Sequence, residues 1–238
     1  MILAFFLLAS VLQSSKDNGN IEKDIIHTPS GNITISFIGH ATLVLEFNKM
    51  VIHVDPWGQL ADYSRLPKAD LILITHHHFD HLDPKAVDMI TKNGTQIVLT
   101  EETYKTLKKG IVMHNGDTKT VAGIPIEAVP AYNATKDHLQ FHPKGRDNGY
   151  VLTIGGQRIY IAGDTEDIPE MESLKNIDIA FLPMNQPYTM LPEQVASAVN
   201  KFHPKILYPY HYGDTDVSKI QKLLSKVSGT EVRIRSMK

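Results

Sequence analysis

Four side chains that commonly bind metal ions follow directly after the apolar run Leu71–Thr75. They form the pattern H-x-H-x-D-H and are His76, His78, Asp80 and His81. The run before them reads L-I-L-I-T, which is typical of a strand that is buried on both faces. Side chains at the end of such a strand have a rigid support, as a catalytic metal site requires. The motif therefore predicts a metal site at the edge of a sheet in an α/β protein.

The spacing within the motif predicts two neighbouring ions. In an extended segment, residues two apart point the same way, so His76 and His78 can bind one ion. A turn at Phe79 would then direct Asp80 and His81 toward a second ion. Neutral imidazole and carboxylate are ordinary zinc ligands, and they also accept manganese or iron. A polar loop with chance histidines is the alternative interpretation.

Four ligands do not complete two coordination spheres, and later segments offer more. His142 lies in a loop, Asp164 follows a predicted strand in Gly163-Asp164-Thr165, and His211 follows another in Tyr210-His211. The competing interpretations are a turn aspartate for Asp164 and a packing histidine for His211. Loop geometry alone leaves His138 as a rival to His142.

The rest of the chain alternates strand and helix patterns. Expected strands cover residues 32–37, 41–47, 50–54, 71–75, 96–99, 120–130, 150–154, 158–162, 177–182, 205–210 and 231–234. Expected helices cover residues 84–93, 101–109, 192–202 and 217–227. Residues 132–147 carry no periodic signal and are expected to form a functional loop. The pattern predicts sheets that are covered by helices on their outer faces.

Composition narrows the possible classes of protein. The absence of cysteine excludes disulfide frameworks, thiolate zinc fingers, iron–sulfur clusters on cysteine and cysteine nucleophiles. A net charge of −2 gives no reason to expect a nucleic-acid partner. A length of 238 residues fits one domain, which we place at residues 21–238.

The first residues are expected to lie outside this domain. Residues 1–12 are apolar and too few to span a bilayer, so no transmembrane span is predicted. A polar, turn-rich stretch follows, and we interpret residues 1–20 as a signal peptide and linker, with cleavage between Ser10 and Ser15. This predicts export to the periplasm or the outside of the cell. A buried N-terminal segment is the alternative.

The combination of H-x-H-x-D-H, a loop histidine, G-D-T after a strand and a late strand-end histidine resembles the metallo-β-lactamase superfamily. The resemblance runs from about Ile33 to Ile234. The segments Ile38–Thr42 and His53–Pro56 resemble one branch, which includes sugar-phosphate lactonases and N-acyl-phosphatidylethanolamine phospholipases of the D type. The resemblance implies a four-layered αβ/βα sandwich with a dinuclear site.

The resemblance also implies a ligand set and a mechanism. One metal ion would be held by His76, His78 and His142, and the other by Asp80, His81 and His211, with Asp164 bridging them. Two divalent ions, zinc in the first place and Mn²⁺ or Fe²⁺ otherwise, would lower the pKa of a shared water. Asp80 would orient this nucleophile and pass a proton to the leaving group. Asp55 is the expected partner that fixes an imidazole tautomer.

The expected function is metal-dependent hydrolysis of a small-molecule ester, lactone, phosphodiester or amide. One alternative is a metal-binding module of the same fold without turnover, and another is a di-iron oxidoreductase. The sequence leaves the substrate, the native metal and the oligomeric state open.

Overall fold

Each half of the chain folds into one seven-stranded sheet. The structure is a computed structural model that describes residue 18 and residues 21–238. The predicted signal peptide therefore lies outside the described residues, apart from Asn18. The first sheet contains, in spatial order, β1 (Glu22–Thr28), β2 (Gly31–Gly39), β3 (Thr42–Phe47), β4 (Met50–Val54), β5 (Leu71–Leu73), β6 (Gln96–Leu99) and β7 (Ile111–Val112).

The second sheet follows the same plan. It contains, again in spatial order, β8 (Thr118–Val121), β9 (Ile124–Ala131), β10 (Asp147–Ile154), β11 (Gln157–Ile161), β12 (Ile179–Pro183), β13 (Ile206–Tyr210) and β14 (Glu231–Val232). In both sheets the first four strands are antiparallel and the remaining strands pair in parallel. The site follows the carboxyl ends of several of these strands, as described below.

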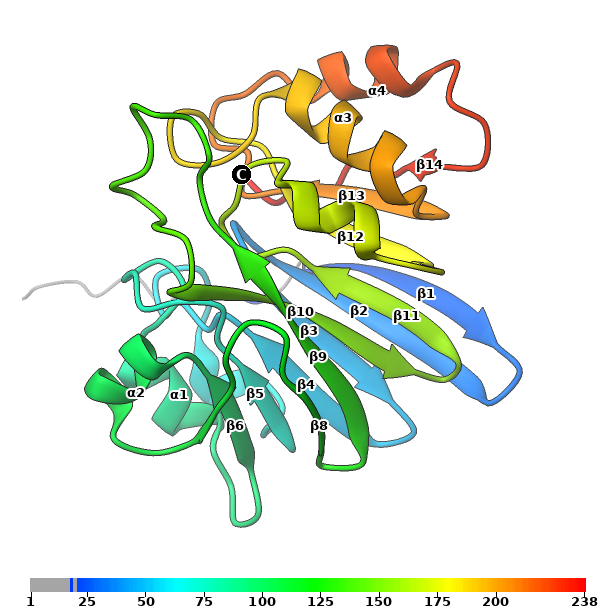
Figure 1. Cartoon of the computed structure of the whole chain (residues 1–238). Coiled ribbons are helices and arrows are strands. Elements are labelled where there is room, and N and C mark those ends of the chain that lie inside the picture. The colour runs from blue at the N-terminus through cyan, green and yellow to red at the C-terminus, as the bar shows by residue number, and fades with distance from the viewer. Residues whose placement is uncertain (1–17, 19–20) are drawn as a thin grey trace, which may run out of the picture.

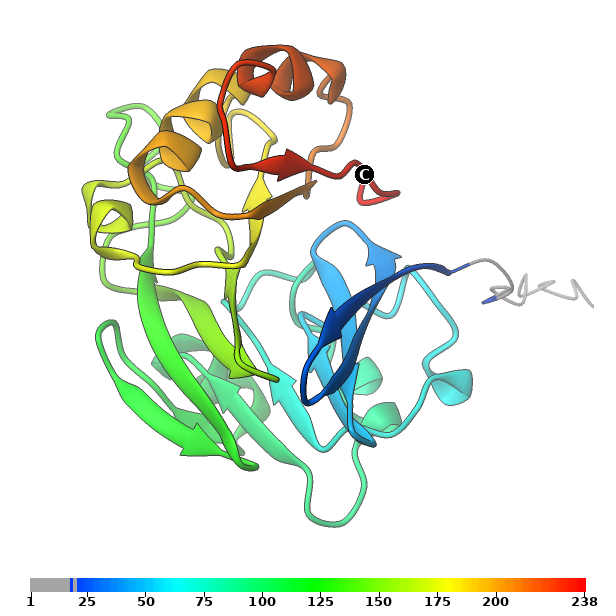
Figure 2. The same ribbon diagram turned by 90° about the vertical axis from the view of Figure 1, so that its right-hand side faces the viewer.

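Helices cover the outer face of each sheet (Figures 1 and 2). On the first sheet these are α1 (Pro84–Ile90) and α2 (Glu101–Leu107), and on the second α3 (Pro192–Phe202) and α4 (Ser218–Leu224). Short 3₁₀ turns occupy Tyr63–Arg65 and Pro169–Ser173. None of the described helices combines the length and the apolar character needed to cross a bilayer.

Alternation along the parallel strands explains the layers. In β5, Leu71 and Leu73 face the core between the two sheets, whereas Ile72 faces α1. In β12, Phe181 faces the same central core, whereas Ala180 faces α3. Both faces of these strands are therefore apolar, because each face is covered. The result is helix, sheet, sheet, helix, so the predicted four-layered α/β sandwich is confirmed.

The structure corrects several predicted elements. The sequence analysis missed β1 and β7 and extended β5 to Thr75, two residues beyond its end at Leu73. It also carried the first helix to residue 93, whereas α1 ends at Ile90 because Thr91 adopts an extended backbone (ψ 140°). The expected loop at 132–147 is irregular up to the start of β10.

An ion pair joins the first strand to the end of the chain. The Arg235 guanidinium donates to both carboxylate oxygens of Asp24 in β1, at 2.8 Å each. Arg235 also lies over the ring of Phe37. Bidentate pairing of this kind fixes geometry as well as charge. It connects the edge of the first sheet to the segment that follows β14.

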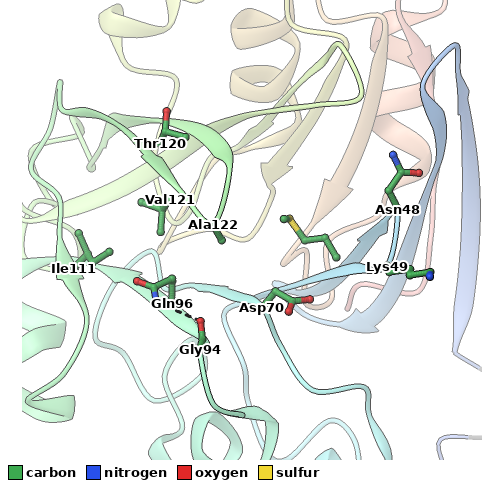
Figure 3. Close-up of a pocket in the computed structure, with 10 residues that line it drawn as sticks. Asn48, Lys49, Asp70, Gly94, Gln96, Ile111, Thr120, Val121 and Ala122 are labelled. Atoms are coloured by element: carbon green, nitrogen blue, oxygen red, sulfur yellow. Dashed lines mark hydrogen bonds between the residues drawn. The ribbon is translucent and has the colours of Figure 1, made fainter.

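An open hollow of about 640 Å³ lies at the amino ends of β5 and β6 (Figure 3). Its lining includes the β3–β4 turn at Asn48 and Lys49, and Asp70 is the acidic side chain among the described residues that line it. Asp70 already pairs with Lys92 at 2.6 Å. The hollow therefore offers no cluster of reactive groups, although it is large.

Candidate metal centre

The H-x-H-x-D-H motif forms a tight turn after β5. The backbone carbonyl of His78 accepts hydrogen bonds from the amides of His81 and Leu82, at 3.0 and 2.9 Å. This turn brackets Phe79, where the sequence predicted one, and brings Asp80 and His81 to the same side as His76. Asp83 then caps α1 by accepting a hydrogen bond from the Lys85 amide.

Three imidazoles form one group of potential ligands. His76 Nε2 lies 3.1 Å from His78 Nδ1, and the rings of His78 and His142 are 4.8 Å apart. The ligand atoms of His76, His78 and His142 all lie within 4.8 Å of one another. The structure thus brings together the three side chains that were assigned to one ion.

A second group lies beside the first. It contains Asp80, His81 and His211, and also His40, with ligand atoms within 4.8 Å of one another. His211 Nε2 lies 3.8 Å from Asp80 Oδ2, and the rings of His81 and His211 stack at 5.3 Å. His40 was not among the ligands that the sequence predicted. The structure places it in the site.

Asp164 lies between the two groups. Its Oδ2 is 3.4 Å from His142 Nε2 and 3.3 Å from His211 Nε2, and its Oδ1 is 3.4 Å from His81 Nε2. It follows β11 through Gly163, whose φ of +66° turns the chain sharply. Asp164 therefore lies close to histidines of both groups.

Buried carboxylates orient two of the histidines through their Nδ1 atoms. Asp55 Oδ2 lies 2.8 Å from His81 Nδ1, which makes Asp55 the expected tautomer-fixing partner. Asp147, at the start of β10, orients His142 in the same way, because its Oδ2 lies 3.1 Å from His142 Nδ1. The sequence analysis missed Asp147. The only available signal was its place five residues after His142, at the end of an irregular loop.

The backbone near the site is strained. His40, Asp55 and His211 all have positive φ, at 51°, 44° and 47°. The His211 amide donates to the His40 carbonyl at 2.9 Å, which ties the β2–β3 turn to the end of β13. Such conformations persist only where surrounding contacts impose them, and they gather at functional sites.

Burial and neighbouring charge set the protonation of the cluster. Burial lowers the pKa of His76 well below its usual value and that of His78 to about 4. Burial also disfavours charge on His81, but Asp164 and Asp55 outweigh it and raise its pKa well above the ordinary value. Burial raises the pKa of Asp80, but the hydrogen bond with His40 and the nearby imidazoles outweigh burial and lower this pKa to about 2.

The donor set fits divalent metal ions. His81 Nε2, His211 Nε2 and Asp164 Oδ1 are buried and have no hydrogen-bond partner among the described residues. Buried polar atoms are almost always paired, so three such atoms aimed at one another call for a common partner. Imidazole nitrogen and carboxylate oxygen together match zinc, manganese or iron.

Other residues that the sequence singled out lie elsewhere. His138 Nδ1 lies 3.0 Å from Glu166 Oε1 and belongs to none of the ligand groups. His77 lines the cavity without joining a group. His27, His114 and His203 are exposed. The sequence analysis missed Glu166, which holds the 132–147 loop by accepting the amides of Ala134 and Thr135.

A cavity of about 600 Å³ opens onto the cluster. Besides the predicted ligands, its lining includes Phe79, Phe141, Asn185 and Tyr188. A concave, largely apolar pocket with convergent polar groups is the usual form of a small-molecule site.

Comparisons with known proteins agree with this geometry. A family described as "Beta-lactamase superfamily domain" matches residues 34–211. A "UPF0173 metal-dependent hydrolase" from Thermococcus kodakarensis is 33% identical over 194 residues, covering 76% of this chain and 84% of the relative. One from Pyrobaculum islandicum is 35% identical over 196 residues, covering 75% and 83%.

Solved structures extend the comparison. A crystal structure from Parabacteroides distasonis, named as that of a metal-dependent hydrolase, has 54% identity and a TM-score of 0.90, and covers 92% of this chain and 100% of its own. The metallo hydrolase Igni18 from Ignicoccus hospitalis has 26% identity and a TM-score of 0.73, covering 86% and 95%. The chain therefore belongs to the metallo-β-lactamase superfamily, among its metal-dependent hydrolases.

Proposed function

We propose that this hydrolase works with two divalent metal ions and cleaves a small-molecule ester, lactone, phosphodiester or amide. The proposed ligands are His76, His78 and His142 for one ion and Asp80, His81 and His211 for the other, with Asp164 shared. The observation that carries the proposal is the convergence of these side chains from distant segments into two adjacent groups around Asp164.

The ions would supply Lewis acidity, which activates water and stabilises negative charge on oxygen. The remaining chemistry belongs to the chain. Asp80 lines the cavity and, with a pKa near 2, is ionised at neutral pH. It therefore accepts a hydrogen bond from the attacking water and orients it. His40 holds this carboxylate in place through its Nε2.

Zinc is the first candidate for the native metal, with Mn²⁺ or Fe²⁺ as alternatives, because the ligand types suit all three. Elemental analysis of freshly purified protein tests the identity and number together. We expect about two ions per chain, about one in a His142→Ala variant and about one in a His211→Ala variant. One ion or none in the wild-type protein would contradict the dinuclear proposal.

Turnover is tested with a panel of a chromogenic ester, a lactone, a cephalosporin and a phosphodiester. We expect Asp80→Ala to lower kcat by about 10²–10⁴-fold, the range for loss of a positioned acid–base group. Asp88→Ala is the matched control, because the Asp88 side chain is 69% exposed and pairs with Lys109 at the surface. Full turnover in Asp80→Ala would contradict the role of Asp80 in orienting the attacking water.

A metal-binding module without turnover is the competing proposal. It predicts two bound ions but no hydrolysis of any substrate in the panel above the rate of free metal ions. The presence of a lined cavity beside the cluster favours the enzyme, since a purely structural site is closed on all sides.

We also propose that the signal peptide at the start of residues 1–20 directs export and is cleaved between Ser10 and Ser15. The apolar run and the polar stretch after it support this reading of the sequence. Mass spectrometry of the protein recovered from its natural host is expected to show a mature chain that begins between residues 11 and 15. A mature chain that begins at Met1 would contradict it.

A further inference from the structure

We infer, resting on the proposed hydrolase function, that the substrate is an uncharged ester or lactone with an apolar group. The inference comes from the chemistry of the cavity that opens onto the metal cluster. Among the described residues that line it, none is lysine or arginine. Besides His40, His77 and Asn185, the non-ligand lining consists of the aromatic rings of Phe79, Phe141 and Tyr188.

The aromatic side chains that line the cavity come from three separate segments of the chain. Phe79 comes from the metal-binding turn, is 72% exposed and contacts the Trp57 ring edge-on at 5.9 Å. Phe141 comes from the 132–147 loop and contacts Tyr188 edge-on at 4.9 Å. Tyr188 is 45% exposed. Single exposed apolar residues are common, but rings that gather at the opening of a reactive site indicate an apolar ligand.

Two cationic side chains of the 132–147 loop have partners outside the cavity. Arg146 pairs with Asp147 at 2.8 Å and donates to the Phe141 carbonyl at 2.8 Å. Lys144 pairs with Glu170 at 2.7 Å. Both line a separate cavity of about 320 Å³, together with Glu101 and other residues. Neither is therefore available to bind a charged group next to the cluster.

Apart from the proposed metal ions, the described lining offers no lysine or arginine for an anionic substrate group. A phosphate group is normally held by arginine or lysine donors, which are missing from this lining. The amide of Asn185, in contrast, suits a neutral carbonyl oxygen. This separates the chain from the phosphate-bearing substrates named for the branch that its opening strands resemble.

A matched pair of substrates tests the charge argument. We expect the metal-loaded enzyme to show a KM for 4-nitrophenyl octanoate at least tenfold below that for octyl 4-nitrophenyl phosphate, which has the same tail and leaving group. We also expect kcat/KM to fall about tenfold or more from the octanoate to the acetate. An equal or lower KM for the phosphodiester would overturn the inference and leave the hydrolase proposal intact.

Trp57 gives a readout that does not depend on turnover. It is the only tryptophan in the sequence and contacts Phe79, so its fluorescence reports on the opening of the cavity. We expect 2-octanone to change this fluorescence with a Kd at least tenfold below that of 2-butanone. Equal affinity for the two ketones would overturn the inference. If the ketones differ as expected but no substrate is hydrolysed, only the proposed function has failed.

Variants locate the effect. Phe79→Ala and Tyr188→Ala are expected to weaken 2-octanone binding and raise the octanoate KM about five- to tenfold, with metal content unchanged. Leu223→Ala is the control, because Leu223 is 43% exposed on α4 and does not line the cavity. Unchanged affinity in both aromatic variants would contradict the assignment of these rings to the substrate.

Discussion

The imidazole Nε2 of His40 lies 3.1 Å from Oδ2 of Asp80, across forty positions of sequence. His40 occupies the turn between β2 and β3, and its ring also lies 3.8 Å from that of His211. This one side chain therefore contacts two of the proposed ligands of the same ion. Its own pKa is lowered by burial, so it stays neutral and donates to the carboxylate.

His40→Asn is expected to lower turnover about 10–100-fold, the usual effect of removing a residue that orients a metal ligand. Asparagine tolerates positive φ but is too short to reach Asp80. The backbone is therefore preserved while the contact is lost. His114→Asn is the control, because the His114 side chain is 68% exposed. Steady-state kinetics with metal analysis checks the prediction, and an unchanged kcat would refute it.

Asp55→Asn is expected to reduce metal affinity about 10–100-fold and to destabilise the fold by about 1–3 kcal/mol. Asp55 is fully buried and accepts hydrogen bonds from the Thr75 amide, the Thr75 hydroxyl and His81 Nδ1. An amide has a single acceptor oxygen, so it cannot serve all three donors. Competition with a chelator and urea unfolding measure the two effects. Asp88→Asn, on the surface, should change neither.

His53 predicts a pH dependence of stability. It is buried, its Nε2 donates to the Pro67 carbonyl at 2.9 Å, and burial lowers its pKa to about 4. In the unfolded chain the pKa of His53 returns to about 6.5. Between pH 6.5 and 4, His53 is therefore protonated in the unfolded state but not in the folded state. Stability is therefore lost as the pH falls from 6.5 to 4, by at most about 3 kcal/mol from this group.

His53→Gln keeps a donor for Pro67 and removes the titration. Urea unfolding of chelator-treated protein at several pH values should show a shallower loss for His53→Gln than for the wild type across this window. Parallel curves would show that His53 does not contribute.

Gly149→Ala is expected to cost about 3 kcal/mol, at the upper end for overpacking. A Cβ atom at Gly149 in β10 would lie 2.6 Å from the Ala162 carbonyl oxygen, and this backbone cannot move without separating β10 from β11. Gly123→Ala meets nothing within 4 Å and costs only its left-handed backbone, about 1 kcal/mol. Thermal unfolding should rank the two variants in this order. The reverse order would contradict the steric argument.

The parts of the fold that sequence predicted well are those with a local signature. The runs at 71–75 and 177–182 read as buried strands because both of their faces are apolar, and the structure covers both faces. No hydrophobic pattern in the sequence predicts β1, because Ile25 is 54% exposed. This strand is instead held by pairing with β2 and by the Asp24–Arg235 ion pair. Contacts between residues so far apart in the sequence produce no periodic pattern of side chains.

The same distinction applies to the site. The motif at positions 76–81 was visible because its spacing is local, and the later ligands followed from strand ends. Asp147 and Glu166 were invisible, since a carboxylate that holds a loop looks like any loop carboxylate until its partners are known. His40 could be noticed in a turn, but its contact with Asp80 depends on how β2 and β5 are placed in one sheet.

The division of the chain into one sheet per half has a consequence for assembly. The first half supplies His76, His78, Asp80 and His81, and the second supplies His142, Asp164 and His211. Neither half carries a complete set for either group. If the chain were cut in the short connection between β7 and β8, metal ions would bind to ligands from both fragments and stabilise their association. Occupancy of the metal site would then report that the two halves had associated.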